Sequence, residues 1–109
     1  MKSTTAYRKI KEYVSRPDAV LGREDDGPCY YRHPEDPSIR CAVGCLIPNT
    51  QYYPSLEGRN ALVARGTVKV LQGLDPEYLL EVQQAHDAAL TVEDFLEQFE
   101  EISRNYGVI

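Results

Sequence analysis

All three cysteines of this chain fall between residues 29 and 45, together with one of its two histidines. Cys29, His33, Cys41 and Cys45 offer three sulfur ligands and one nitrogen ligand, a set that suits tetrahedral Zn²⁺. Three residues separate the members of each pair, whereas structural zinc sites commonly separate paired cysteines by two. Free cysteines are also among the most frequently buried side chains. We therefore predict no cofactor, with a small zinc-binding interaction module as an alternative.

A cysteine nucleophile is the second chemistry that these residues offer. A thiol-dependent hydrolase or transferase needs a thiolate beside an imidazole, and Cys41 with His86 would supply both groups. However, His86 falls on the apolar face of its predicted helix, where a histidine is more often a hydrogen-bonded core residue. Asp87 points about 100° away around the helix axis, which is a poor position for orienting that ring. A cysteine-dependent enzyme is therefore an alternative, and catalysis is not the main prediction.

Tyrosines and arginines around the cysteines indicate a third possibility, a binding surface. Aromatic rings stack on bases and on other side chains, and arginine pairs with phosphate or carboxylate groups. This mixture suits either a nucleotide-type small molecule or a protein partner. We predict that the protein binds without catalysis, and that recognition involves Tyr30, Arg32, Arg40, Tyr53, Glu57, Arg59, His86 and Asp87.

A β-hairpin is expected to position the first of these side chains. Residues 29–33 and 39–44 alternate apolar and polar side chains around the turn-rich residues 34–38. The alternation places Tyr31, Cys41 and Val43 against the core. It places the side chains on the other face toward solvent, namely Tyr30, Arg32, Arg40, Ala42 and Gly44.

Helical spacing of apolar side chains predicts helices over residues 4–15, 75–89 and 91–106. Asp75 and Thr91 have the side chains of helix N-caps, and Gly107 is a typical residue just past a helix end. Residues 60–73 are ambiguous between helix and strand, and the helix is preferred. The predicted fold class is α+β: one mainly helical domain over residues 1–109, with the hairpin packed on a helical layer.

Charge and hydropathy exclude some classes of partner. The net charge is −5, divided into +3 over residues 1–74 and −8 over residues 75–109. A domain that binds duplex nucleic acid is normally basic over one whole face, which this division disfavours. No apolar run approaches the roughly 20 residues of a membrane span, and the N-terminal residues lack the apolar core of a secretory signal. We expect a cytoplasmic protein, and so short a chain favours a homo-oligomer if the ligand pocket is enclosed.

Four linked motifs resemble those of a family of small, uncharacterised bacteriophage and prophage proteins, over about residues 29–106. They are Cys29-x-Tyr31-Arg32, Arg40-Cys41-Ala42-Val43-Gly44-Cys45-Leu46-Ile47-Pro48, Tyr53-Pro54-x-x-Glu57-Gly58 and Gln84-Ala85-His86-Asp87-x-Ala89. The resemblance implies a viral or mobile-element origin and a place in the cytoplasm of the bacterial host. By analogy, it implies an accessory or counter-defence factor that sequesters a nucleotide-type molecule or blocks a host protein.

Overall fold

The computed structural model describes residues 1–17, 19 and 30–109, and this part of the chain contains helices and loops without any strand. Three short 3-10 turns accompany the α-helices. The elements in chain order are α1 (Ser3–Val14), η1 (Gly44–Leu46), η2 (Pro54–Leu56), α2 (Ala61–Thr67), η3 (Lys69–Leu71), α3 (Pro76–Ala88) and α4 (Val92–Asn105).

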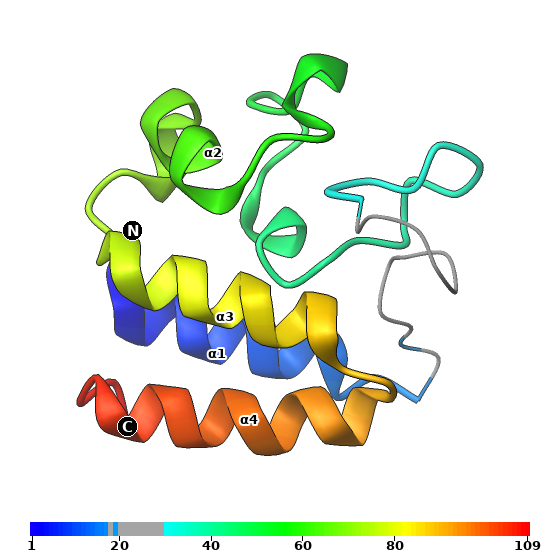
Figure 1. The fold of residues 1–109 in the computed structure, drawn as a ribbon. Helices are drawn as coiled ribbons and strands as arrows, with labels where there is room; N and C mark the ends of the chain where they lie inside the picture. The colour runs from blue at the N-terminus through cyan, green and yellow to red at the C-terminus, as the bar shows by residue number, and fades with distance from the viewer. Residues whose placement is uncertain (18, 20–29) are drawn as a thin grey trace.

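The three long helices lie beside one another, and the segment between α1 and α3 folds over them (Figure 1). Helices α1 and α3 run in the same direction, and α4 runs in the opposite direction and contacts both. Within the covering segment, η1 packs on α1 and α2 packs on α3. The covering segment therefore packs on two of the three long helices, α1 and α3.

Side-chain caps fix the starts of the last three α-helices. The Asp75 carboxylate accepts hydrogen bonds from the amides of Glu77 (2.9 Å) and Tyr78 (3.3 Å), and the Thr91 hydroxyl accepts one from Asp94 (3.0 Å). These bonds satisfy amides that have no partner within the first helical turn. The predicted helices over residues 4–15, 75–89 and 91–106 are confirmed within one or two residues at each end.

The preferred helix within residues 60–73 is also confirmed, as α2, with the Asn60 side chain accepting from the Val63 amide at 3.0 Å. It ends at Thr67, and the 3-10 turn η3 follows. Gly107 has a φ of 68° beyond the end of α4, a left-handed conformation that glycine adopts without steric cost.

The core joins the helical layer to the covering segment. The rings of Phe95 and Phe99 in α4 stack with centroids 5.4 Å apart, and Tyr7 of α1 stacks on Phe99 at 5.2 Å. Both phenylalanines are fully buried, as the apolar spacing of this helix predicts. Other buried apolar side chains include Ala6, Ile10, Val14, Val43, Leu46, Ile47, Leu56, Ala61, Ala64, Val68, Leu71, Leu74, Tyr78, Leu79 and Val82.

The predicted β-hairpin over residues 29–44 is wrong, because the described residues 30–44 form no strand. The chain does turn back on itself: the His33 amide donates to the Ile39 carbonyl (2.9 Å), and the Cys41 amide donates to the Tyr30 carbonyl (3.0 Å). A ladder does not extend from these two bonds within the described residues. The amides of residues 31 and 32 are taken by a side chain described below.

The second half of the expected hairpin winds into a helical turn. The Cys45 amide donates to the Cys41 carbonyl at 3.0 Å, so residues 41–46 follow helical spacing and lose the alternation of a strand. Ala42 and Gly44, which were predicted to face solvent, are buried as a result. Over the described residues the fold is therefore helical, and the α+β prediction is wrong.

Gly44 also shows how closely this turn approaches the preceding loop. A Cβ atom at this position would lie 2.2 Å from the backbone oxygen of Tyr31, far inside van der Waals contact. Only glycine allows the two backbone segments to pack at this distance.

The longest described helix, α4, has 14 residues. None of the helices in the described ranges has the length and apolar composition that a membrane crossing requires.

Candidate functional site

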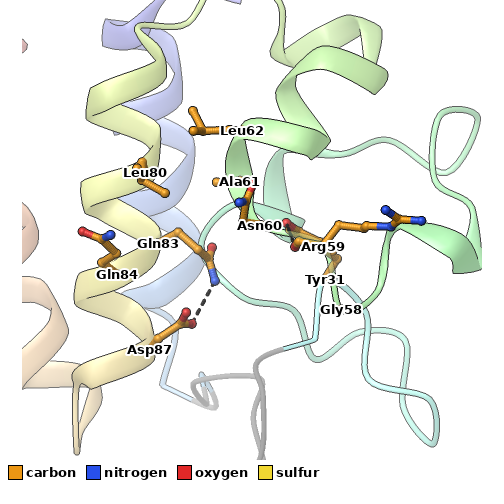
Figure 2. A pocket seen from close by; sticks show the side chains of 10 residues that line it. All are labelled: Tyr31, Gly58, Arg59, Asn60, Ala61, Leu62, Leu80, Gln83, Gln84 and Asp87. Carbon is orange, nitrogen blue, oxygen red and sulfur yellow. Dashed lines mark hydrogen bonds between the residues drawn. The ribbon is translucent and has the colours of Figure 1, made fainter.

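A cleft of about 570 Å³ opens between α3 and the residues that lead into α2 (Figure 2). Helix α3 supplies one wall, and residues 58–62 supply the other. The lining residues are Tyr31, Gly58, Arg59, Asn60, Ala61, Leu62, Leu80, Gln83, Gln84 and Asp87. The volume falls in the range typical of small-ligand sites or of pockets that receive side chains of a partner.

Local hydrogen bonds hold the wall opposite α3. The buried Tyr31 hydroxyl donates to the Arg59 carbonyl at 2.7 Å, which ties the loop at residue 31 to the start of α2. Gly58 has a φ of 78° and makes the turn that precedes this wall. The Asn60 cap then sets the first turn of α2, from which Leu62 reaches the cleft.

Two polar side chains of α3 cross the floor of the cleft. Gln83 is 8% exposed, and its Nε2 donates to Asp87 Oδ1 at 3.0 Å, one helical turn further along. Figure 2 shows the Gln83 amide extending from α3 toward residues 59–61. Among the described residues, Gln83 Oε1 is buried and has no hydrogen-bond partner. An acceptor in this state is costly to leave unpaired, which marks Gln83 for a role beyond packing.

Acidic groups lie close to the floor of the cleft. The Asp87 side chain is 53% exposed and carries its charge at the edge of the cleft. Burial is the main cause that raises the pKa of Tyr31, and the nearby groups Cys41, Glu57 and Asp87 raise it further. Arg59 is the one cation among the described lining residues, and Figure 2 shows its guanidinium extending away from α3.

Glu57, predicted as a binding residue, holds the structure together from inside. Its carboxylate accepts hydrogen bonds from the amides of Tyr31 (2.9 Å) and Arg32 (3.1 Å) and from the Tyr52 hydroxyl (2.5 Å). These bonds replace the strand pairing that residues 31 and 32 were predicted to make. Charge-assisted bonds of this kind are stronger than those between neutral groups.

The two arginines predicted to share an outer hairpin face make separate contacts with the protein itself. The Arg32 guanidinium lies 4.3 Å from the centre of the Tyr52 ring and donates to the Ile47 carbonyl at 3.0 Å. Arg40 Nε donates to the Pro37 carbonyl at 3.1 Å, and the Arg40 amide donates to the Tyr13 hydroxyl at 2.9 Å. Neither arginine lines the cleft.

The predicted tyrosines also lie apart from the cleft. Tyr30 is half-buried, with its ring edge-to-face against the His33 ring at 5.2 Å. Tyr53 lines a smaller hollow of about 270 Å³ on another side of α2, which it shares with Arg59 and Val63. Of the eight predicted binding residues, Arg59 and Asp87 are the two that reach the cleft.

His86 lies in the core beside the cleft. It is 1% exposed, and its ring packs edge-to-face against Phe95 at 5.5 Å. Its Nδ1 lies 3.8 Å from Asp87 Oδ1, so the two residues approach each other more closely than their angular separation on the helix suggests. The expectation of a polar core histidine describes this position well.

The described thiols, Cys41 buried and Cys45 half-buried, have the properties of structural cysteines. Cys41 is 1% exposed and accepts a hydrogen bond from the Gly44 amide at 3.3 Å, and Cys45 donates to the Ala42 carbonyl at 3.0 Å. Burial raises the pKa of each thiol to about 12, so almost none of either is thiolate at neutral pH. These properties argue against the alternative in which Cys41 acts as a nucleophile.

The alternative zinc site combines described and undescribed residues. Cys29 lies outside the described residues, and His33 Nδ1 accepts a hydrogen bond from the Glu35 amide at 3.2 Å. Within the described ranges, no three His, Cys, Asp or Glu side chains gather closely enough to hold a metal ion.

Most of the cleft residues were not predicted from the sequence. Gln83 lies between Leu79 and Asp87 at intervals of four residues, on the edge of the apolar face of α3. A polar side chain at the edge of an apolar helix face was the feature of the sequence that could have indicated a buried side-chain amide. Leu62 and Leu80 gave no such signal, because a partly exposed leucine on a helix is common.

Comparisons of the chain with protein-family models, with curated proteins and with solved structures found no match.

Proposed function

We propose that this protein binds a partner without catalysis, and that the cleft between α3 and residues 58–62 is the binding site. The buried Gln83 oxygen carries this proposal, since a hydrogen-bond donor from outside the described residues would satisfy it. The exposed Asp87 carboxylate beside it adds a charged contact at the cleft edge. The high pKa of the described thiols supports binding over cysteine chemistry.

Of the two ligand classes expected from the sequence, a host protein is better supported than a nucleotide-type molecule. Phosphate groups need cations, yet Arg32 and Arg40 donate to carbonyl groups of the chain, and the Arg59 guanidinium extends away from α3. Leu62 lines the cleft and is 43% exposed, so it presents apolar surface there, as protein interfaces do.

The resemblance to bacteriophage and prophage proteins gives this proposal its setting. In that setting the protein is an accessory or counter-defence factor in the cytoplasm of the bacterial host. It acts by occupying a surface of a host protein, so its effect requires stoichiometric amounts of the protein.

A capture experiment with two matched variants tests the proposal. Leu62→Arg places a charge in the cleft wall, and Leu90→Arg makes the same change at a side chain that is 83% exposed and does not line the cleft. We expect the wild-type chain and Leu90→Arg to retain the same bacterial protein from a lysate, and Leu62→Arg to lose it. The retained protein, once purified, should slow hydrogen exchange at residues 60–62 and 80–87.

Three outcomes would contradict this function. Equal retention by both variants would show that the cleft is not the interface. A nucleotide released by heat denaturation and seen by mass spectrometry would support the small-molecule class instead. A concentration-dependent dimer in which the same residues are protected would identify a second copy of the chain as the partner.

A further inference from the structure

We infer that the cleft receives a tryptophan side chain of the partner protein, with the indole N–H donating to Gln83 Oε1. This inference rests on the proposed function, because it specifies which group of the partner enters the cleft. The juxtaposition that supports it is a buried acceptor, without a partner among the described residues, beside the apolar side chains of both cleft walls.

The Gln83 amide determines which polar group the floor of the cleft can bind. Gln83 is 8% exposed, and its Nε2 donates to Asp87 Oδ1 at 3.0 Å. The oxygen of the same planar amide points away from that bond, and Figure 2 shows it on the side of residues 59–61. A group that pairs with this oxygen must be a hydrogen-bond donor, and covering the oxygen without a donor is costly.

Apolar side chains line both walls beside this acceptor. Leu62 extends from α2 and Leu80 extends from α3, and Ala61 lies at the start of α2. Leu62 is 43% exposed, so a group that covers it removes apolar surface from water. The cleft volume of about 570 Å³ has room for a flat aromatic group between the walls. The occupant that fits therefore combines a large apolar body with a hydrogen-bond donor.

An indole has this combination of groups. Its ring system is large and apolar, and its single N–H donates without bringing an acceptor that would need a partner of its own. Buried indole N–H groups usually have a hydrogen-bond partner, and tryptophan is enriched among the residues that dominate binding at protein interfaces. One indole would cover the exposed part of Leu62 and satisfy the Gln83 oxygen.

Tyrosine and arginine are the nearest competitors, because both are also enriched among the dominant residues of interfaces. A tyrosine hydroxyl is an acceptor as well as a donor, so it needs a second polar partner when it is buried. A guanidinium has five N–H donors, which is more than the Gln83 oxygen can accept. The Gln83 oxygen thus favours the single donor of an indole.

Titration of the isotopically labelled full chain, followed by NMR, tests the inference. The main probes are the Nα-acetyl amides of tryptophan and of benzothienylalanine, in which a sulfur atom replaces the indole N–H with little change of shape. We expect tryptophan to shift the Gln83 side-chain amide signals and to bind about tenfold more tightly than the sulfur analogue, which covers the acceptor without a donor. The chain contains no tryptophan, so the fluorescence of the tryptophan probe measures the same binding without an indole background.

Three results would overturn the inference. The first is equal binding of tryptophan and its sulfur analogue, since the indole N–H would then contribute nothing. The second is tighter binding of the Nα-acetyl amide of tyrosine or of arginine. The third is the absence of any tryptophan binding.

Two variants locate the effect. Gln83→Met keeps a side chain of similar length and removes the amide oxygen, so it should reduce the preference for tryptophan over its sulfur analogue to less than about twofold. Leu62→Ala removes apolar surface from the cleft wall, so it should weaken both probes severalfold and leave their ratio unchanged. The second variant changes an exposed residue, so it remains informative if Gln83→Met disturbs the fold. An unchanged preference in Gln83→Met, or unchanged binding of both probes in Leu62→Ala, would contradict the site.

This titration and the capture experiment fail independently. If the cleft-dependent host protein is captured but tryptophan does not bind, the inference is wrong and the proposed function stands. If tryptophan binds as expected but Leu62→Arg captures as well as the wild type, the cleft has its specificity and the proposed function is wrong.

Discussion

Replacement of Gly44 by alanine tests the contact that positions the loop at Tyr31. The added Cβ would lie 2.2 Å from the Tyr31 carbonyl oxygen, 2.7 Å from its Cα and 2.8 Å from its carbonyl carbon. All three are backbone atoms, so no side-chain rotation relieves the clash. The backbone of Tyr31 also has little freedom to move, since its amide is bonded to Glu57 and its hydroxyl to Arg59.

The magnitude follows from this geometry. Overpacking a core typically costs about 1–3 kcal/mol, and a clash with anchored backbone belongs at the upper end, about 3 kcal/mol. In a domain of about this size, a loss of 1 kcal/mol lowers Tm by about 4–8 °C, so we expect a decrease of roughly 12–24 °C.

Urea and thermal denaturation measure this change, and Gly66→Ala in α2 is the matched control. A Cβ at Gly66 would meet no atom within 4 Å, and alanine favours a helix by about 1 kcal/mol over glycine. Gly66→Ala should therefore leave stability unchanged or raise it. A Gly44→Ala protein within about 0.5 kcal/mol of the wild type would refute the close packing of residues 31 and 44.

Three further predictions concern Arg32, the thiols and Glu100. Arg32→Ala should lower the free energy of unfolding by about 1–2 kcal/mol, because it removes the contact with the Tyr52 ring and a hydrogen bond; an unchanged urea midpoint would contradict this. Cys41 and Cys45 should resist iodoacetamide at neutral pH in the folded chain, because the pKa of each thiol is raised to about 12; peptide mass spectrometry that finds labelling as fast as in urea would contradict the raised pKa. Hydrogen bonds from Lys11 and Tyr7 hold the pKa of Glu100 below its ordinary value of 4.5. The ionised Glu100 carboxylate therefore contributes its full stabilisation above pH 4.5, and this stabilisation is lost as the pH falls through the lowered pKa. Glu100→Gln should therefore lose less thermal stability than the wild type between about pH 6 and about pH 3, and an identical loss would count against the ion pair.

The helices could be predicted from the sequence because their signals are local. Asp75, Asn60 and Thr91 each accept a hydrogen bond from an amide two or three residues ahead, and such a cap needs no other part of the chain. The stacking of Phe95 and Phe99 likewise follows from a spacing of four residues on one helix.

The loop over residues 30–44 could not be predicted in the same way, because distant side chains determine its shape. Alternation of apolar and polar residues favours a strand, but Glu57 takes the amides of Tyr31 and Arg32 from 25 or more residues away. The close approach of Gly44 is equally nonlocal. The Arg32 guanidinium packs on the Tyr52 ring and donates to the Ile47 carbonyl, so the prediction that Arg32 faces solvent is wrong.

The cleft was predictable only in part. Asp87 was expected to contact a ligand and does line the cleft, whereas Gln83 became notable only when its buried oxygen was seen to lack a partner among the described residues. Whether a polar side chain on a helix edge is paired depends on the segment packed against it, and here that segment is the start of α2.

The bonds to Glu57 make the amides of Tyr31 and Arg32 unusual reporters. Both lie in a loop without regular secondary structure, where amide hydrogens normally exchange rapidly with solvent, yet a carboxylate from elsewhere in the chain protects them. Their exchange rates therefore measure how often Glu57 releases the loop, separately from the opening of the helices. Because Tyr31 forms part of the cleft wall, the same two signals would reveal whether the cleft is assembled before a partner arrives or only afterwards.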